Sequence, residues 1–325
     1  MKEKILNLLK TAKDFVSGQE ISDQFGVSRT SVWKAIRQLE ELGYVIEAVR
    51  NRGYRLVSEP DLLDEARIRE QLSTKWAGSS LLVLDEVDST NNEAKRRAEE
   101  GAEHGLLVVG LQQTAGRGRR GRVWESGEGE GIFMTLLLKP EIEPGNASML
   151  TLVMAMAVRR ALEETAGLQT QIKWPNDIIC QGKKLVGILT EMSAQIDCIN
   201  HIVIGVGINV HNAAFPEGVQ QIATSIFQQT GQHISRAALI ASVMEQFEVY
   251  YEKYLETEDL SALQEEYNQN LVNCNQAVRV LDIREGYTGT ARGINARGEL
   301  LVLTGDGIRK VSAGEVSVRG VYGYV

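Results

Sequence analysis

Residues 177–209 read DIICQGKKLVGILTEMSAQIDCINHIVIGVGIN. Three runs of mainly aliphatic residues are separated here by two short polar turns, Gln181-Gly182 and Gln195-Ile-Asp197. The runs have the length and composition of strands, and turns this short join antiparallel neighbours. The stretch therefore predicts an antiparallel part of a sheet, not a regular alternation of parallel strands and helices.

The region around this stretch mixes strands and helices in no regular order. Hydrophobic periodicity predicts where they lie. We expect strands at 81–87, 106–111, 132–138, 185–191 and 202–208. We expect helices at 62–72, 92–100, 147–165 and 236–255. The fold class is therefore α+β, with a central mixed sheet and flanking helices.

The first sixty residues predict a winged helix-turn-helix. Ser17 and Glu20 have the spacing of a capping box, and Ser28 is placed to cap a second helix. The basic turn Arg50-Asn-Arg52-Gly53 then joins two strands of a ribbon. This order of helices and ribbon favours DNA binding, and the alternative is a small three-helix interaction domain.

Charge also favours DNA binding at this end of the chain. The whole chain carries a net charge of −8, whereas residues 1–60 hold ten Lys and Arg against eight Asp and Glu. The second helix would enter a major groove, and the basic turn would lie near phosphates or a minor groove. The expected DNA contacts are Ser28, Arg29, Thr30, Trp33, Lys34, Arg37, Arg50 and Arg52.

The last fifty residues have a different texture. From residue 274 on, short β runs are punctuated by glycines, which predicts a small SH3-like β-barrel. We therefore expect three domains: a winged helix-turn-helix at 1–60, an α+β domain at 61–273 and a β-barrel at 274–325.

Composition excludes several other classes of protein. With 325 residues, 43% hydrophobic and 24% charged, the chain is neither a coiled coil nor disordered. The apolar stretch at 149–158 is too short to span a membrane, and the N-terminal MKEKILNLLK does not resemble a secretory signal. Cys180, Cys198 and Cys274 form no disulfide framework, so we expect a reducing compartment, the cytoplasm.

The most unusual segment is GRGRRGRVW at 116–124, here called the arginine loop. Its glycines match the pattern GxGxxG, but no helix is predicted after it, so it is not a dinucleotide fingerprint. Four guanidinium groups on a glycine-rich backbone would stay disordered until an anion orders them. The segment predicts a phosphate-binding loop, with a solvated basic loop or a nucleic-acid patch as the alternative.

Three further segments carry polar groups of matching chemistry. KWPND at 173–177 suits a nucleoside triphosphate with Mg²⁺, although alone it would be a structural turn. GKKLVG at 182–187 brings a lysine into an apolar strand, which is costly unless that lysine faces a site. Ser89-Thr-Asn91 ends the predicted strand 81–87 and alone would be a helix cap. No Walker motif occurs, and the four histidines have no metal-ligand spacing.

Taken together, these segments resemble the biotin protein ligases. The resemblance rests on Ser89-Thr-Asn91, Gln113, GRGRRGR with Trp124, KWPND, GKKLVG and Gly205-Val-Gly-Ile-Asn209, in this order. Because they follow a winged helix, they resemble the bifunctional bacterial ligases that also repress the biotin operon. The resemblance covers essentially the whole chain.

The resemblance implies an activity and a set of partners. Members of this family join biotin and ATP into biotinyl-5'-AMP with loss of pyrophosphate, and then pass biotin to a lysine of a biotin carboxyl carrier domain. Mg²⁺ accompanies the ATP. In the repressor, biotinyl-5'-AMP is the corepressor, and a ligand-bound homodimer binds an inverted-repeat operator.

The resemblance also implies roles for particular residues. The ureido ring of biotin would be bound by Ser89, Thr90, Asn91 and Gln113, with Gln112 as the alternative to Gln113. Biotin and phosphate would be covered by Arg117, Gly118 and Arg119. Lys184 would bind the biotin carboxyl group, Trp124 would stack on adenine, and the triphosphate and metal would be held by Lys173, Asn176 and Asp177. Arg122 and Asn209 are expected in the same site, and the catalytic residues would be Lys184, Arg119 and Asp177.

Two other functions are compatible with parts of the pattern. One is a transcription factor whose ligase domain only senses a ligand, although the intact Lys184, Lys173 and Asp177 weigh against it. The other is a lipoate or octanoate ligase, whose apolar acyl chain would not require the polar cluster at 89–91.

Overall fold

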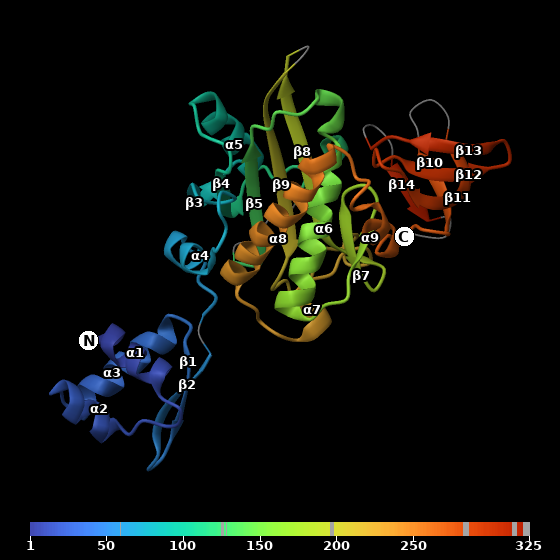
Figure 1. Ribbon diagram of the computed structural model, residues 1–325. Coiled ribbons are helices and arrows are strands. Elements are labelled where there is room, and N and C mark those ends of the chain that lie inside the picture. Colours follow the sequence, from blue (N-terminus) through green and yellow to red (C-terminus); the bar gives the residue numbers. More distant parts are fainter. Residues whose placement is uncertain are drawn as a thin grey trace. The chain divides into compact units, whose positions relative to one another are not determined.

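The computed structural model describes residues 1–58, 60–124, 127, 129–195, 198–281, 286–313 and 317–320. The chain divides into two compact units, Met1–Leu62 and Leu63–Val325 (Figure 1).

The first unit is the predicted winged helix-turn-helix. Its elements are α1 Lys2–Thr11, α2 Gly18–Phe25, α3 Arg29–Glu41, β1 Val45–Val49 and β2 Gly53–Ser58. The predicted caps are confirmed, because Ser17 Oγ accepts from the Glu20 N–H at 3.1 Å and Ser28 Oγ accepts from the Ser31 N–H at 3.2 Å. Gly26 ends α2 in the left-handed conformation, with φ 64°. The helices enclose a separate apolar core that includes Ile5, Ile21, Val32, Ile36 and Leu39.

The second unit is built on a seven-stranded mixed sheet. In sequence order its strands are β3 Leu81–Val87, β4 Leu107–Gln113, β5 Gly131–Leu138, β6 Gln171–Lys173, β7 Asp177–Cys180, β8 Lys183–Ala194 and β9 Ile199–Asn209. The strand order is β3-β4-β5-β9-β8-β7-β6, and β3 and β4 are the parallel pair. The antiparallel arrangement predicted from 177–209 is confirmed in β7, β8 and β9. Ile196 and Asp197 of its second turn lie outside the described residues.

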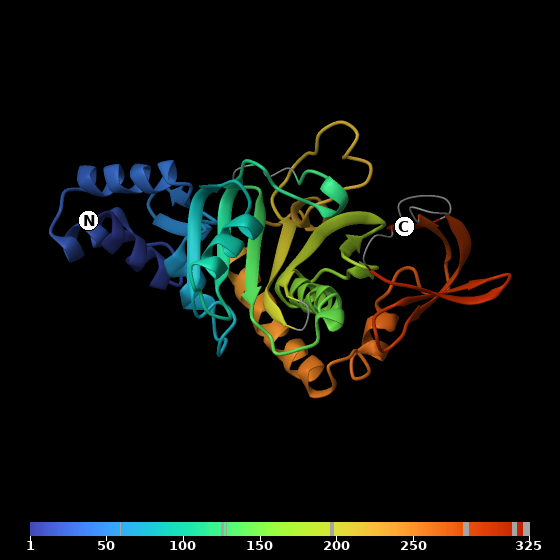
Figure 2. The same cartoon turned by 90° about the horizontal axis from the view of Figure 1, so that it is seen from above.

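Helices cover both faces of this sheet. They are α4 Glu65–Gln71, α5 Thr90–Glu99, α6 Met149–Ala166, α7 Ile226–Thr230, α8 Arg236–Thr257 and α9 Gln264–Gln269. On β5, Ile132, Met134 and Leu136 belong to the core with α6 and α8, whereas Leu137 packs with α5. This alternation follows from the period of two in a strand, and Figure 2 shows α6 and α8 beside one face of the sheet. The predicted helix at 62–72 begins later, because Asp64 Oδ1 caps it by accepting from the Arg67 N–H at 2.9 Å.

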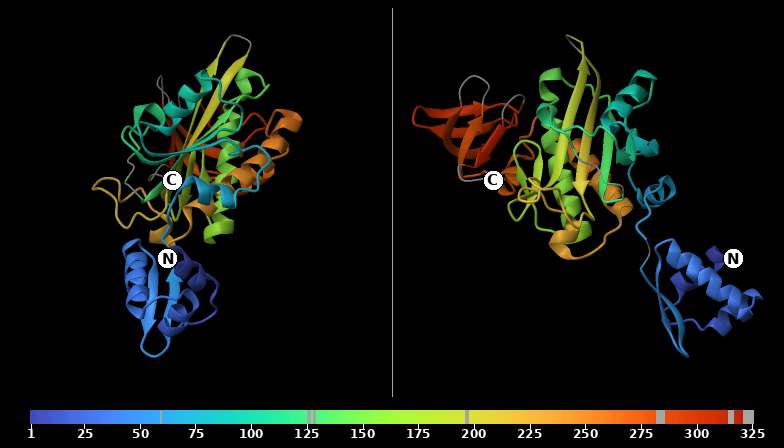
Figure 3. Two further views of the ribbon diagram at one scale, coloured as in Figure 1. Left: turned by 90° about the vertical axis from the view of Figure 1, so that its left-hand side faces the viewer. Right: turned by 180° about the vertical axis from the view of Figure 1, so that it is seen from behind.

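The C-terminal strands form a second sheet within this unit. They are β10 Ala277–Leu281, β11 Tyr287–Ile294, β12 Leu300–Thr304, β13 Gly307–Val311 and β14 Ser317–Gly320. All pairings are antiparallel, in the order β13-β12-β11-β10-β14, so the last strand returns beside the first (Figure 3). This sheet shares its core with the central sheet. We propose that it is nevertheless a domain of its own. The chain would then have three domains, with boundaries near residues 60 and 273.

Cys180, Cys198 and Cys274 are all free thiols. None of the helices formed by the described part of the chain is long and apolar enough to cross a bilayer.

Candidate functional site: a glycine-floored pocket below the arginine loop

A pocket opens on the α5 side of the central sheet. Its walls come from the start of α5, the end of β4, the arginine loop and the middle of β8 and β9. Its lining includes Ser89, Thr90, Asn91, Gln113, Arg117, Gly118, Arg119, Trp124, Asn176 and Lys184. The structure thus brings together ten of the predicted residues from five separate segments of the sequence.

The floor of the pocket is built by glycines in cross-strand register. Gly205 on β9 pairs with Thr135 on one side and with Leu189 on the other. Two residues further along, Gly207 pairs with Phe133 and Gly187. Because residues two apart share a face of a strand, these two rows form a trough at whose centre β9 itself carries no side chain.

Each row of the floor lies directly under one predicted site residue. A Cβ at Gly205 would lie 2.2 Å from Asn91 Oδ1, and one at Gly207 would lie 2.6 Å from Trp124 Cε2. Real Cβ atoms do not approach other atoms this closely, so both positions require glycine for the close approach of the overlying side chain.

One end of the trough is polar and almost fully enclosed. Ser89, Thr90 and Asn91 are at most 4% exposed. Gln113 Oε1 accepts from the Thr90 N–H at 2.9 Å, and Thr90 Oγ1 lies 3.2 Å from the same oxygen. Gln112 instead pairs with Glu86 in the sheet register and is absent from the pocket lining, so the geometry favours Gln113.

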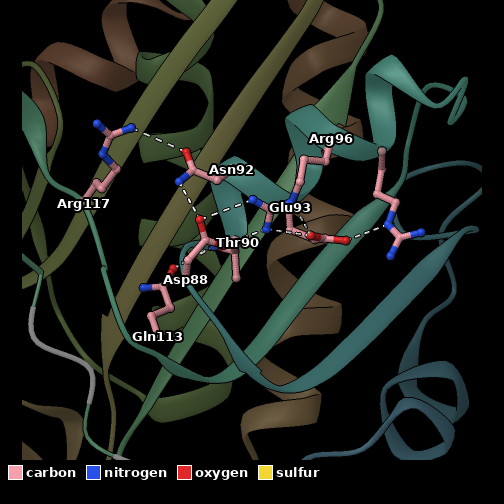
Figure 4. A network of polar contacts seen from close by, with 8 residues as sticks. Asp88, Thr90, Asn92, Glu93, Arg96, Gln113 and Arg117 are labelled. Carbon is pink, nitrogen blue, oxygen red and sulfur yellow. Dashed lines mark hydrogen bonds and ion pairs between the residues drawn. The ribbon is translucent and has the colours of Figure 1, made fainter.

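A charged network holds the start of α5 behind this polar end (Figure 4). Arg96 binds Asp88 at 2.7 Å and Glu93 at 2.7 Å, and Asn92 Nδ2 donates to Asp88 Oδ2 at 2.8 Å. The Arg96 hydrogen bond keeps the pKa of Asp88 well below its usual value. Arg117 of the arginine loop reaches toward the same group, with Nη1 3.5 Å from Asn92 Oδ1.

The arginine loop forms a short hairpin over the pocket. The Gly118 N–H donates to Arg122 O at 2.7 Å, and the Trp124 N–H donates to Gly116 O at 2.9 Å. Arg119 points inward, where Nη1 donates to Asn176 Oδ1 at 2.8 Å and Nη2 to Ala313 O at 2.6 Å. Burial lowers the pKa of Arg119. That an anion orders this loop stays a prediction.

The opposite end of the trough carries a lysine–carboxylate pair. Lys184 Nζ lies 2.6 Å from Asp177 Oδ1 and 5.4 Å from the centre of the Trp124 ring. Lys183 turns away and donates to Gln220 O at 3.1 Å. The expectation that a lysine of this strand faces a site is therefore met by Lys184.

Lys173 lies in the sheet next to this pair. It is 5% exposed and pairs across the β6–β7 turn with Asp177. Burial lowers the pKa of Lys173 to about 8, and the positive charges of Lys184 and Arg319 contribute to this lowering. The negative charge of Asp177 acts in the opposite direction and raises it. A buried cation with such a pKa is ready to take up an anionic group.

Four predicted site residues do not line the cavity: Lys173, Asp177, Arg122 and Asn209. Arg122 is exposed on the arginine loop, and Asn209 Nδ2 donates to Thr224 O at 3.0 Å. Sequence reasoning also missed parts of the site. Phe133, Thr135 and Leu189 were not expected in it, and the signal for Thr135 was a single hydroxyl in the otherwise apolar strand GIFMTLLL.

A metal site made by the protein alone is not found. Among the residues that the structure describes, no three His, Cys, Asp or Glu side chains group as metal ligands. Near Lys184, Asn176 lines the pocket and Asp177 lies just outside its lining, with one Asp177 oxygen engaged by Lys184. This donor set fits a Mg²⁺ ion that arrives with phosphate oxygens as most of its ligands.

The first unit presents the predicted recognition face to solvent. Thr30, Trp33, Lys34 and Arg37 are all exposed on α3. In the ribbon, Arg52 Nη2 pairs with Asp14 at 3.1 Å, and its guanidinium stacks 4.3 Å from the Phe15 ring centre. Arg50, at the turn, is exposed.

Known proteins match the chain along nearly its whole length. The HTH domain model matches residues 2–55, the Biotin/lipoate A/B protein ligase family model matches 83–209, and the Biotin protein ligase C terminal domain model matches 274–319. A crystal structure described as biotin protein ligase from Aquifex aeolicus in complex with biotin and ATP aligns with a TM-score of 0.67 at 32% identity. That alignment covers 74% of this chain and 99% of the other.

Two relatives match this chain over nearly its whole length. The bifunctional ligase/repressor BirA of Bacillus subtilis (strain 168) is 41% identical over 321 residues, which is 98% of each chain. The bifunctional ligase/repressor BirA of Escherichia coli (strain K12) is 32% identical over 317 residues, 97% of this chain and 96% of its own. By these matches and its domain order, the chain belongs to the family of the bifunctional ligase/repressor BirA.

Proposed function

We propose that this chain is a biotin–[biotin carboxyl carrier protein] ligase and a repressor of biotin genes. One observation carries the ligase assignment. A single trough joins an enclosed hydrogen-bonding end, at Thr90, Asn91 and Gln113, to a cationic end at Lys184 and Arg119. Biotin has the same order of groups, with a neutral cyclic urea at one end and a carboxylate at the other.

The first step joins biotin to ATP. The biotin carboxylate oxygen attacks the α-phosphorus, a new P–O bond forms, and the bond to pyrophosphate breaks. Lys184 and Arg119 offset the negative charge where carboxylate and phosphate meet. Asp177 orients Lys184 through their 2.6 Å contact.

The second step moves biotin to the carrier. An uncharged lysine amine of the carrier attacks the acyl carbon, the acyl–oxygen bond breaks, and AMP leaves with the electron pair. The arginine loop covers the mixed anhydride and limits its hydrolysis until that amine arrives. No covalent bond to the ligase is needed in either step.

The remaining predicted residues support ATP. Trp124 rests on Gly187 and Gly207, where an adenine ring can stack against it. Lys173 would hold the triphosphate, and Asn176 and Asp177 would hold a Mg²⁺ ion, which would neutralise charge on the phosphate oxygens. Arg122 and Asn209 act from outside the pocket lining.

The repressor role rests on the first unit. Its exposed α3 face and basic turn suit an operator, and two copies suit an inverted repeat. We propose that biotinyl-5'-AMP is the corepressor and that it promotes a homodimer in the cytoplasm.

Three assays test the ligase function against its alternatives. Biotin and ATP should support pyrophosphate exchange and label a biotin carrier domain, whereas a carrier whose acceptor lysine is replaced by arginine should stay unlabelled. A pure sensor would bind biotin without exchange. A lipoate ligase would label a lipoyl domain instead, and either result would overturn the assignment.

A further inference from the structure

The polar end of the pocket is joined to a carboxylate that lies outside the pocket lining. Glu191 on β8 accepts from Asn91 Nδ2 at 2.8 Å and pairs with Lys95 Nζ at 2.6 Å. Asn91 in turn lies 2.7 Å from Thr135 Oγ1, and Thr135 lies 2.8 Å from Thr90 Oγ1. We call Glu191, Asn91, Thr135 and Thr90 the polar relay.

Every member inside the sheet is shielded from water. Thr135 is 0% exposed, Asn91 3% and Thr90 4%. Leaving a buried polar atom without a partner costs roughly 1–3 kcal/mol. The hydrogen bonds of the polar relay must therefore be arranged so that each donor hydrogen points at an acceptor.

Glu191 sets that order because it is ionised. Burial would raise the pKa of Glu191, but hydrogen bonds from Lys95 and Asn91 and the charges of Lys95 and Arg117 outweigh burial, so its pKa is lowered. An ionised carboxylate only accepts hydrogen bonds. Asn91 must therefore turn its amide nitrogen toward Glu191 and Leu189 O, the latter at 3.2 Å.

The orientation of Asn91 determines the hydrogen-bond directions of Thr135 and Thr90, and so what the pocket offers to a ligand. With its nitrogen committed, Asn91 presents Oδ1 to Thr135, which gives its single hydrogen to that oxygen. The hydrogen of Thr90 goes to Gln113 Oε1, 3.2 Å away. Because Thr135 has given its hydrogen to Asn91, Thr90 Oγ1 faces the pocket as an acceptor.

We infer that Glu191 and Thr135 are positioning residues that make the pocket select a ligand N–H at Thr90. This inference rests on the proposed function, and it identifies the feature of the cyclic urea that is read there. In an analogue with an oxygen in place of the recognised ring N–H, that ring oxygen would face Thr90 Oγ1, and both atoms are acceptors. Sites built to receive a hydrogen bond reject such analogues by about 10⁴-fold.

The test measures dissociation constants for biotin and for its two cyclic carbamate analogues, each with one ring N–H replaced by oxygen. Wild-type protein should bind biotin far more tightly than one of the two. Glu191→Gln removes the charged acceptor and leaves Leu189 O to hold the Asn91 nitrogen, so the order of the relay weakens and the preference for biotin over that analogue should fall about ten-fold or more.

Two further variants probe the middle of the relay. Thr135→Val keeps the shape but removes the hydroxyl, and it should weaken biotin binding by about 10- to 100-fold. Thr135→Ser should restore binding to within about three-fold of wild type. A merely structural role for Thr135 would not be rescued by a smaller residue that keeps only the hydroxyl.

Glu248→Gln is the matched control for lost stability. Glu248 is a buried carboxylate on α8 that accepts backbone N–H groups of Lys75, Trp76 and Ala77. This variant should melt at a lower temperature and keep the wild-type preference between ligands. The role of the polar relay is disproved if Glu191→Gln and Thr135→Val also keep the wild-type preference between ligands. The ligase function itself is disproved if the wild-type protein binds no biotin.

Discussion

Gly205 is the residue on which the polar end of the pocket depends most directly. Its missing side chain leaves room for Asn91, whose Oδ1 would lie 2.2 Å from an added Cβ. We expect Gly205→Ala to displace Asn91 and weaken biotin binding by about 100-fold, as small displacements in binding sites do. Calorimetry with biotin measures the loss. Gly305→Ala is the control, because no atom lies within 4 Å of its added Cβ, and equal binding by the two variants would refute the explanation.

Lys173 predicts a pH dependence for ATP binding. Because burial and neighbouring cations lower its pKa to about 8, it is charged below that pH and loses its proton above it. Affinity for a non-hydrolysable ATP analogue should be constant from pH 7 toward 8 and then fall by up to about ten-fold per pH unit. Lys173→Arg should flatten the profile, whereas Lys183→Ala, outside the pocket, should leave it as in wild type. A flat wild-type profile would contradict the role of Lys173.

At the scale of elements, Arg119 is a side chain that ties the arginine loop to neighbouring segments. Arg119 joins it to Asn176 and to Ala313 O. We expect Arg119→Ala to open the loop, so that biotinyl-5'-AMP escapes at least about ten-fold faster. Gel filtration of the protein with labelled adenylate measures its retention. Arg120→Ala is a control, because Arg120 is exposed at the turn of the loop. Unchanged retention in Arg119→Ala would remove this role.

The turn of the ribbon in the first unit contains two arginines in different settings. Arg52 is bound to Asp14 and stacked on Phe15, whereas Arg50 is exposed at the turn. We expect Arg50→Ala to weaken operator binding and to reduce the salt slope by about one, with an unchanged melting temperature. Arg52→Ala should lower the melting temperature slightly. Mobility shifts at several salt concentrations measure this slope. The DNA is selected from a random pool with the wild-type protein. An unchanged salt slope in Arg50→Ala would show that Arg50 is not a phosphate contact.

At the scale of the whole molecule, ligand and operator binding should be coupled. We expect biotin with ATP to convert monomers into dimers and to raise operator affinity by about 5- to 150-fold, the usual range of such couplings. Sedimentation velocity and mobility shifts, each with and without both substrates, measure the two effects. A protein that binds the operator equally well in both conditions would be a repressor without a corepressor.

The C-terminal sheet is joined to the site by contacts that cross long distances in sequence. Trp174, in the KWPND segment, is 1% exposed, and its Nε1 donates to Gly298 O at 3.0 Å. Its backbone N–H donates to Asn273 Oδ1 at 3.3 Å. The Trp174 bond to Gly298 and the Arg119 bond to Ala313 place the C-terminal sheet beside the pocket.

The sequence by itself determined the features that depend on residues close together in the chain, such as helix caps and short turns. Ser17 and Ser28 cap the helices of the first unit, because capping depends on residues three apart. The short polar turn at 181–182 placed β7 and β8 side by side, because a two-residue turn permits no other pairing. The resemblance to the biotin protein ligases assembled the list of site residues, most of which line one pocket.

The tertiary structure alone decided the features that depend on strand register and on distant neighbours. Register aligns Gly205 and Gly207 between β5 and β8, and only this alignment turns isolated glycines into a floor. Lys184 and not Lys183 faces the pocket, because the pleat of β8 turns successive side chains to opposite faces. Glu191 meets Asn91 across 100 residues of chain, and no local pattern in the sequence encodes a contact between groups so far apart.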